Sequence, residues 1–168
     1  GSIARVNKLE QIITGPDSAG SFPGPACYSN GGEMPTITDA DLVIGKINPD
    51  NFAAGKIKLS KELAKKAITE NIGKIVNLDY DVAALAISEI VDETMSNAAR
   101  VHTVEQGHET SNRTLIAFGG AAPLHIARVA EKLRVSNVII PTNASVGSAV
   151  GFLKAPVGYE VVKSLRML

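Results

Sequence analysis

The sequence predicts an α/β fold in which a parallel βαβ unit follows a long helix and a loop region rich in Gly and Pro. Three observations support this fold class. Apolar residues recur at helical spacing over 81–106, and two short apolar runs flank a helical segment in the last third of the chain. Gly and Pro cluster at 14–35. The composition, 45% hydrophobic and 20% charged, is typical of globular proteins.

Length and charge narrow the function classes. The 168 residues favour one domain or slightly more. The 17 basic and 17 acidic residues cancel, which argues against a nucleic acid or an anionic membrane as partner. The single cysteine, Cys27, excludes an internal disulfide framework and suits the reducing cytoplasm, which is the expected location. No apolar run approaches the roughly 20 residues that span a bilayer.

The first segment is predicted to form a hairpin. Strands at 2–6 and 11–13 flank the polar pair Asn7-Lys8, which suits a tight turn. The stretch 14–35 is expected to be a loop, because it holds too much Gly and Pro for a helix or a central strand.

Two helices are predicted next. The shorter one is predicted at 39–46, with Thr38 as its cap, because Thr38 begins a Thr-x-x-Asp helix-start signal. The longer one, at 61–76, is capped by Ser60 and carries its apolar residues at helical spacing.

The longest helix is predicted at 81–106, with Gly107 as its stop signal. Its polar residues, including Asp92, are expected to lie largely outside the buried face. That face is predicted to consist of Ala83, Ala86, Ile87, Ile90, Val91, Met95, Ala98 and Val101.

The pattern of apolar residues changes in the last third of the chain. The runs 114–118 and 138–140 show no polar alternation, as in strands that are buried on both faces. Helices are expected at 123–133 and 145–154, and a final edge strand at 159–162. Strand, helix, strand and helix in this order predict parallel strands.

The strand-to-helix turn at Gly119-Gly120 is the best candidate binding site. It places free backbone N–H groups and the positive end of a helix dipole at the carboxyl edge of the sheet. A plain tight turn explains the same residues, and neither standard nucleotide fingerprint is present. The segment 143–151 also allows close approach of a ligand, or only of another helix, through its small residues Gly147, Ala149 and Gly151.

Four further side chains are candidate substrate or metal ligands: Cys27, Asp39, Asp41 and His125. Each has a structural alternative, which is a buried thiol for the cysteine, helix capping for the two aspartates, and a polar core or capping residue for the histidine. His102 and His108 complete no metal motif.

Seven segments occur together in an informative order. They are GSIAR at 1–5, GPDSAG at 15–20, PGPACY at 23–28, PTITDADL at 35–42, NPDNF at 48–52, EQGH at 105–108 and AFGGA at 117–121. Through them the chain closely resembles the hydantoinase A / 5-oxoprolinase family over essentially its whole length. That family also includes a subunit type found in acetone carboxylases.

The resemblance implies a fold and a binding site. The chain would be the C-terminal lobe fragment of an actin-like (ribonuclease H-like) ATPase fold, as in actin, sugar kinases and heat-shock ATPases. Residues 1–57 would form a hairpin and loop segment, and 58–168 the helical and βαβ part of the nucleotide-binding lobe. The residues expected near the adenosine of ATP are Gly119, Gly120 and Ala121 in the turn, and Ser148, Ala149 and Gly151 in the following helix.

The resemblance also implies an activity. The parent protein would use ATP and Mg²⁺ to open a cyclic amide, a hydantoin or 5-oxoproline, by phosphorylating the amide oxygen. The alternatives are an acetone-carboxylase-like subunit that activates a ketone, and a non-catalytic interaction module. The expected partners are the remaining lobe of the same chain and a hydantoinase B-type subunit or domain.

The chain departs from the family pattern in three ways. Ala122 replaces the last glycine of the family's Gly-Gly-Ala-Gly motif. The family's upstream Asp-x-Gly-Gly-Thr phosphate loops are absent, so no catalytic residue can be assigned and the segment alone is expected to be inactive. Further glycines that normally precede Gly1 are missing, so Gly1 is interpreted as a position within a longer polypeptide.

Overall fold

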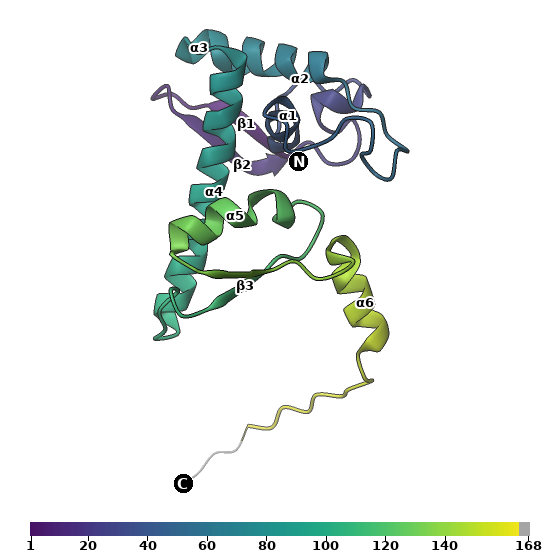
Figure 1. Ribbon diagram of the computed structural model, residues 1–168, viewed down its shortest axis with the longest axis vertical. Helices are drawn as coiled ribbons and strands as arrows, with labels where there is room; N and C mark the ends of the chain where they lie inside the picture. The colour runs from purple at the N-terminus through teal and green to yellow at the C-terminus, as the bar shows by residue number, and fades with distance from the viewer. Residues whose placement is uncertain (165–168) are drawn as a thin grey trace.

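The computed structural model describes residues 1–164 and confirms an α/β fold with two small sheets (Figure 1). The long helix α4 (Tyr80–Glu105) runs through both parts of the molecule. Its first half packs against the N-terminal elements, and its second half packs against the βαβ unit.

The N-terminal hairpin pairs β1 (Ser2–Val6) with β2 (Ile12–Ser18) in antiparallel orientation. The expectation that a loop starts at residue 14 is wrong, because β2 continues through Pro16. The pairing register shifts between Ser2 and Ala4, so β2 contains a bulge. A bulge in a two-stranded sheet is a place where a residue without an N–H group is tolerated.

Helix α1 (Ile37–Val43) starts two residues earlier than predicted. Its cap is Thr36 and not Thr38, since the Thr36 hydroxyl and the Asp39 carboxylate form a reciprocal capping box. Thr36 and Thr38 each precede an aspartate by three residues, so the sequence signal alone could not separate them.

The helix predicted at 61–76 is confirmed as one helical stretch with a wider turn inside it. It consists of α2 (Lys61–Ile68), a π-helical turn (Thr69–Gly73) and α3 (Lys74–Val76). Ser60 caps it as predicted, and its hydroxyl accepts the Leu63 N–H at 3.2 Å.

The first apolar core joins β1, α1, α2, the π-helical turn and the first half of α4. Its buried members are Ala4, Cys27, Ala40, Leu42, Val43, Leu59, Ala64, Ile68, Ile72, Ala83, Ala84 and Ile87. They lie on both sides of residue 57, and the division of the chain at that point stays a prediction.

The boundaries of α4 are confirmed to within one residue, but its buried face is predicted correctly only in its first half. Ala83, Ile87 and Val91 are buried, whereas Met95, Ala98 and Val101 are exposed. Polar residues replace them on the buried side: Ser88, Asp92 and Ser96. The predicted face fails there because Ser88 and Asp92 face Lys46 and His125. It also fails because Ala99, not Ala98, packs against the apolar core of the βαβ unit.

The βαβ unit is confirmed, with β3 (Thr114–Ile116), α5 (Ala122–Leu133) and β4 (Asn137–Ile139). The strands are parallel, with Leu115 opposite Val138. A second apolar core forms under α5 from Val129, Ala130, Leu133 and Val135, with Ala99 and Leu115 packed against it.

The prediction that both strands are buried on two faces is wrong within residues 1–164. Every residue of β4 is exposed, and Ile116 is 52% exposed. Helices cover one face of this sheet, and the other face stays open in the described part of the chain.

The chain then forms a short 3₁₀ turn (Ala144–Val146) and α6 (Gly147–Lys154), which confirms the helix predicted at 145–154. The edge strand expected at 159–162 is wrong, because 155–164 carries no regular structure and pairs with no described strand. Among residues 1–164, no helix combines the length and apolar character required to cross a membrane.

Candidate functional site

The turn that follows β3 is held in a conformation that favours glycine. Gly119 has φ +88°, in the left-handed region, where a side chain would be strained. Its N–H donates to the carbonyl of Ala144 at 2.9 Å. This bond fixes the turn to the segment that follows β4, so the ends of both parallel strands meet at one edge.

The space over this turn is open. Gly120 is exposed, and a Cβ built on it would meet no atom within 4 Å. Ala121 is the N-cap of α5 and provides no side-chain cap. Pro123 has no N–H group and the Leu124 N–H donates to the Ala121 carbonyl at 2.9 Å, so the Ala122 N–H is the donor of the first turn that lacks a capping side chain. The Ala122 N–H and the positive end of the α5 dipole therefore lie at an accessible surface.

The start of α6 lies beside the same turn. A Cβ on Gly147 would lie 2.6 Å from Cδ1 of Phe118, so this glycine allows the helix to approach the aromatic ring closely. Ser148 and Ala149 are exposed on the first turn of α6, and Gly151 is exposed one turn further along. The structure thus brings the turn and the first residues of α6 together, and it leaves Gly151 further away along the helix.

His125, in the first turns of α5, lies in a buried polar cluster. Its Nε2 lies 3.1 Å from Oδ2 of Asp41 on α1, and its Nδ1 lies 2.8 Å from Oδ1 of Asp92 on α4. All three side chains are almost fully buried. Asp41 is therefore not a helix cap, because its carboxylate faces the imidazole from the middle of α1.

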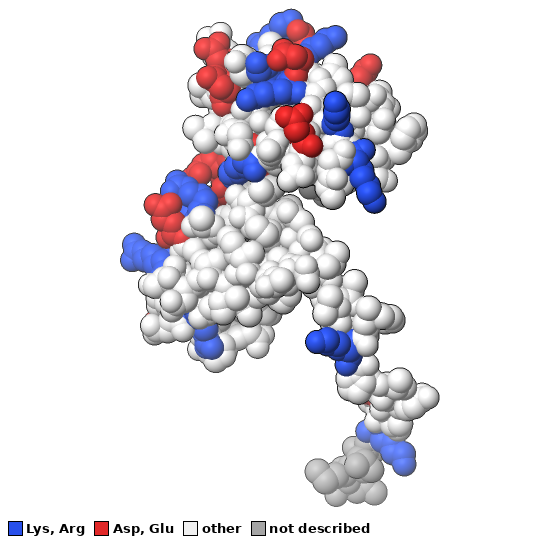
Figure 2. All heavy atoms as spheres, turned by 45° about the vertical axis from the view of Figure 1, so that its right-hand side comes forward, with Lys and Arg blue, Asp and Glu red and all other residues white. Residues whose placement is uncertain are grey.

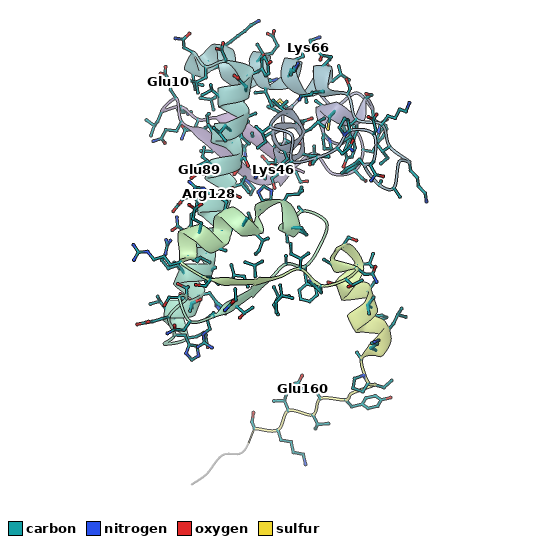
Figure 3. The ribbon with its side chains drawn as sticks, viewed as in Figure 1. Glu10, Lys46, Lys66, Glu89, Arg128 and Glu160 are labelled. Carbon is teal, nitrogen blue, oxygen red and sulfur yellow. The ribbon has the colours of Figure 1, made fainter. Side chains whose placement is uncertain are left out.

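Lys46 completes the cluster at the junction of α1, α4 and α5 (Figure 3). Its Nζ donates to Oγ of Ser88 at 2.8 Å and lies 3.7 Å from Asp41 and 3.8 Å from Asp92. The pKa of His125 is raised above 6.5 because its ring bonds to the Asp41 carboxylate, an effect that outweighs burial and the nearby ammonium.

Sequence reasoning singled out Asp41 and His125 separately but missed Lys46, Ser88 and Asp92. One signal was available. Ser88, Asp92 and Ser96 are spaced by four residues and therefore share one face of α4. A polar stripe of this kind inside a long amphipathic helix indicates a buried polar contact.

Asp39 and Cys27 belong to a different, structural site. The Asp39 carboxylate accepts the N–H groups of Cys27 at 2.7 Å and of Ala26 at 3.3 Å, besides capping α1. Burial and the adjacent carboxylate raise the pKa of the Cys27 thiol well above its usual range, which suppresses the reactive thiolate. No group of three His, Cys, Asp or Glu residues in 1–164 is arranged to hold a metal ion.

The surface adjoining the turn is nearly free of charge. On the face seen in Figure 2, charged side chains gather over the N-terminal part and along α4, while the βαβ unit is almost white. Exposed apolar residues account for this surface: Ile116, Phe118, Ile139, Ile140 and Val146.

Surface ion pairs also link α4 to α5. Arg128, beside Glu89 in Figure 3, bonds both carboxylate oxygens of that residue. Lys132 bridges Glu89 and Glu93. The hydrogen bonds from Arg128 and Lys132 lower the pKa of Glu89 to about 2. The Arg128–Glu89 pair is exposed and Lys132 is mostly covered, but the glutamates of these pairs remain in contact with solvent, in contrast to the carboxylates around His125.

Comparison of the sequence with known protein families identifies the family of this α/β chain. Residues 1–161 match the hydantoinase/oxoprolinase family. The chain belongs to this family, which confirms the resemblance found in the sequence.

Individual relatives are similar over nearly the whole chain. The acetophenone carboxylase gamma subunit of Aromatoleum aromaticum is 39% identical over 100% of this chain and 23% of its own length. The caprolactamase subunit alpha of Pseudomonas jessenii is 35% identical over 99% of this chain and 24% of its own length. The 5-oxoprolinase 1 of Arabidopsis thaliana is 33% identical over 82% of this chain and 12% of its own length.

Two solved structures share the fold. The nucleotide-free structure of acetone carboxylase matches with a TM-score of 0.84 and 33% identity, over 90% of this chain and 21% of that one. The ATP-dependent caprolactamase from P. jessenii matches with a TM-score of 0.82 and 36% identity, over 90% of this chain and 22% of that one. The chain therefore spans about a quarter or less of the length of these relatives.

Proposed function

We propose that this chain is the part of an ATP-dependent enzyme in which the Gly119-Gly120 turn packs against the adenosine of ATP, and that the full-length protein hydrolyses a cyclic amide. The observation that carries the proposal is the open glycine turn at the carboxyl edge of β3 and β4. Ligands of α/β sheets characteristically bind at this edge. The relatives named 5-oxoprolinase and caprolactamase support a cyclic amide as the substrate class.

The residues present fit the adenosine part of the nucleotide. The backbone at Gly120 leaves room for a sugar ring, and the half-exposed Phe118 ring provides apolar surface next to it. Ser148 and Ala149 are exposed at the start of α6, beside the turn, and Gly151 follows them along the helix. This arrangement supports the proposal that the chain forms part of an actin-like nucleotide-binding lobe.

The described residues do not fit a magnesium site. Asp39 caps α1, and Asp41 and Asp92 are committed to His125. When ATP is bound in the complete enzyme, it supplies the phosphoryl group that turns the amide oxygen into a better leaving group. This chain contributes binding and orientation of the nucleotide, and the phosphoryl-transfer groups would come from other parts of the full-length protein.

A carboxylase subunit is the second candidate function. It is favoured by the 39% identity to the acetophenone carboxylase gamma subunit and by the structural match to acetone carboxylase. In this case the same nucleotide site would serve to activate a ketone. Relatives that are themselves named as subunits support a partner chain, for which a hydantoinase B-type subunit is our proposal.

The adenosine site is tested by titrating ATP into the full-length protein and its Gly120→Val variant. Gly120 has no positive φ and open space around it, so valine should leave the fold intact while it blocks the ligand. Gly158→Val is the matched control, since Gly158 is also exposed, with nothing within 4 Å of its Cβ. We expect ATP binding to weaken strongly only in Gly120→Val.

Thermal melts of all three proteins identify any loss of folding. A Gly120→Val variant that melts normally and binds ATP as the wild type does would refute the adenosine site. The two functions are separated by measuring ATP hydrolysis with cyclic amides (5-oxoproline, a hydantoin, caprolactam) and with ketones plus bicarbonate. Stimulation by ketones alone would replace the hydrolase assignment with the carboxylase one.

A further inference from the structure

The buried cluster around His125 contains more charge than capping or packing requires. It joins Asp41 of α1, Lys46 after α1, Asp92 of α4 and His125 of α5. These four side chains are the charged and titratable groups that face the imidazole from the elements packed around it in residues 1–164. Burying several charges is costly unless they are paired and hydrogen-bonded.

The geometry around the ring selects its protonation state. An ionised carboxylate only accepts hydrogen bonds, so a carboxylate at each ring nitrogen requires an N–H at each nitrogen. Asp41 lies 3.1 Å from Nε2 and Asp92 lies 2.8 Å from Nδ1. Only the imidazolium donates to both ionised carboxylates. The Lys46 ammonium, whose Nζ lies 3.5 Å from Nδ1, opposes the charge on the ring, but together the two cations balance the two negative charges.

The cluster occupies the boundary between the two apolar cores. The first core contains no residue of α5, and the second contains no residue of α1. Because the apolar clusters share no residue, the polar contacts from His125 are what connect the beginning of α5 to α1.

His125 is also the anchor of the α5 N-terminus. The buried residues of α5 are His125, Val129, Ala130 and Leu133, so its first turn contributes no apolar side chain to either core. His125 lies four residues after Ala121, or about 6 Å along a helix axis. A rigid helix transmits the position of the imidazole directly to the Gly119-Gly120 turn.

We propose that His125, held as an imidazolium between Asp41 and Asp92, is the positioning residue that fixes the Gly119-Gly120 turn for nucleotide binding, so that ATP affinity falls when the ring loses its proton. The proposal rests on the adenosine site proposed above. The ring itself is buried and does not touch the ligand. On deprotonation one carboxylate loses its donor, the cluster gains a net negative charge, and α5 is no longer held against α1.

The test uses the full-length protein and calorimetric titration with ATP from about pH 6 to about pH 9. In His125→Gln we expect ATP to bind about tenfold more weakly, a coupling typical of linked sites, and the pH dependence seen in the wild type to disappear. Asp92→Asn, which keeps the shape of the side chain and removes its charge, should weaken binding in the same direction and shift the pH profile to lower pH.

Arg128→Gln is the matched control. It removes another ionic contact between α4 and α5, but one that is exposed and does not involve His125. This variant should keep the wild-type affinity and the wild-type pH profile. The ionisation of ATP itself affects the titrations of the wild type and of this variant equally, so its contribution to the pH profile cancels in the comparison.

A direct measurement of the ring keeps the proposal testable if the cluster variants fail to fold. NMR titration of ¹³C-labelled histidine in the wild type should show a doubly protonated His125 at neutral pH, with a midpoint that coincides with the fall in ATP affinity. A neutral ring at that pH, or a pH profile unchanged in a folded His125→Gln, would refute the positioning role.

The two proposals fail in different ways. If the wild type binds no ATP, the adenosine site is wrong and the positioning role falls with it. If Gly120→Val abolishes binding while His125→Gln binds as the wild type does, the adenosine site stands and only the role of His125 is overturned.

Discussion

Because α4 has a buried face and a partly exposed face, alanine substitution of two neighbouring isoleucines should lower the free energy of unfolding by clearly different amounts. Ile87 is fully buried in the first core, whereas Ile90 is only partly buried. Ile→Ala removes three carbon groups, and at about 0.8 kcal/mol for each buried group the transfer loss is roughly 2.4 kcal/mol. The cavity left at a site that cannot collapse brings the expected loss for Ile87→Ala to about 2–5 kcal/mol.

Ile90→Ala should cost clearly less, roughly 1–2 kcal/mol, because part of its side chain is already in water. Urea unfolding followed by circular dichroism measures both variants, since the chain has no Trp to report the transition. Midpoints should shift at constant slope if only stability changes. Equal losses at the two positions, or a loss below about 0.5 kcal/mol for Ile87→Ala, would refute this assignment of the helix face.

Two further outcomes follow from the titratable groups. The raised pKa of His125 means that its stabilising contribution is fully present below 6.5 and is lost as the pH rises through the raised value. The melting temperature of the wild type should therefore fall across that interval, and this fall should be missing in His125→Gln; a parallel fall in both proteins would contradict it. Cys27, whose thiol is buried and whose pKa is raised, should resist a thiol-reactive disulfide reagent at about pH 8 in the native protein and react once urea unfolds it. Rapid modification of the native protein would show that this thiol is accessible.

Signals that act within a few residues predicted most of the secondary structure. Ser60 marks the start of α2, Gly107 follows the end of α4, and Pro123 fits the first turn of α5. The parallel pairing of β3 and β4 followed from the order strand, helix and strand, because a helical crossover returns the chain to the same end of the sheet. Each of these rules depends on the chain itself and not on what packs against it.

Errors arose where distant residues decide the outcome. The continuation of β2 through Pro16 depends on a bulge opposite β1, and the choice of Thr36 over Thr38 depends on where the Asp39 carboxylate is buried. The burial of Asp92 depends on His125, 33 residues further along the chain. Hydropathy assigns an aspartate to the surface, and only the tertiary partner reverses that assignment.

The candidate site, too, could be predicted from the sequence only where it depends on neighbouring residues. The glycine turn was visible in the sequence because its chemistry is local, from the positive φ of Gly119 to the start of α5. Asp41 and His125 were noticed as separate residues, but their contact was not. Spacing along the chain carries no information about a cluster assembled from three different helices.

The length and continuity of α4 have a mechanical consequence. Its 26 residues extend about 39 Å, with one end in the first apolar core and the other beside the second. The helix contains neither Pro nor Gly, the residues at which long helices usually kink. A load applied to the βαβ unit would therefore reach the N-terminal hairpin through a stiff rod, and the described molecule should respond as a lever and not as two bodies on a flexible tether.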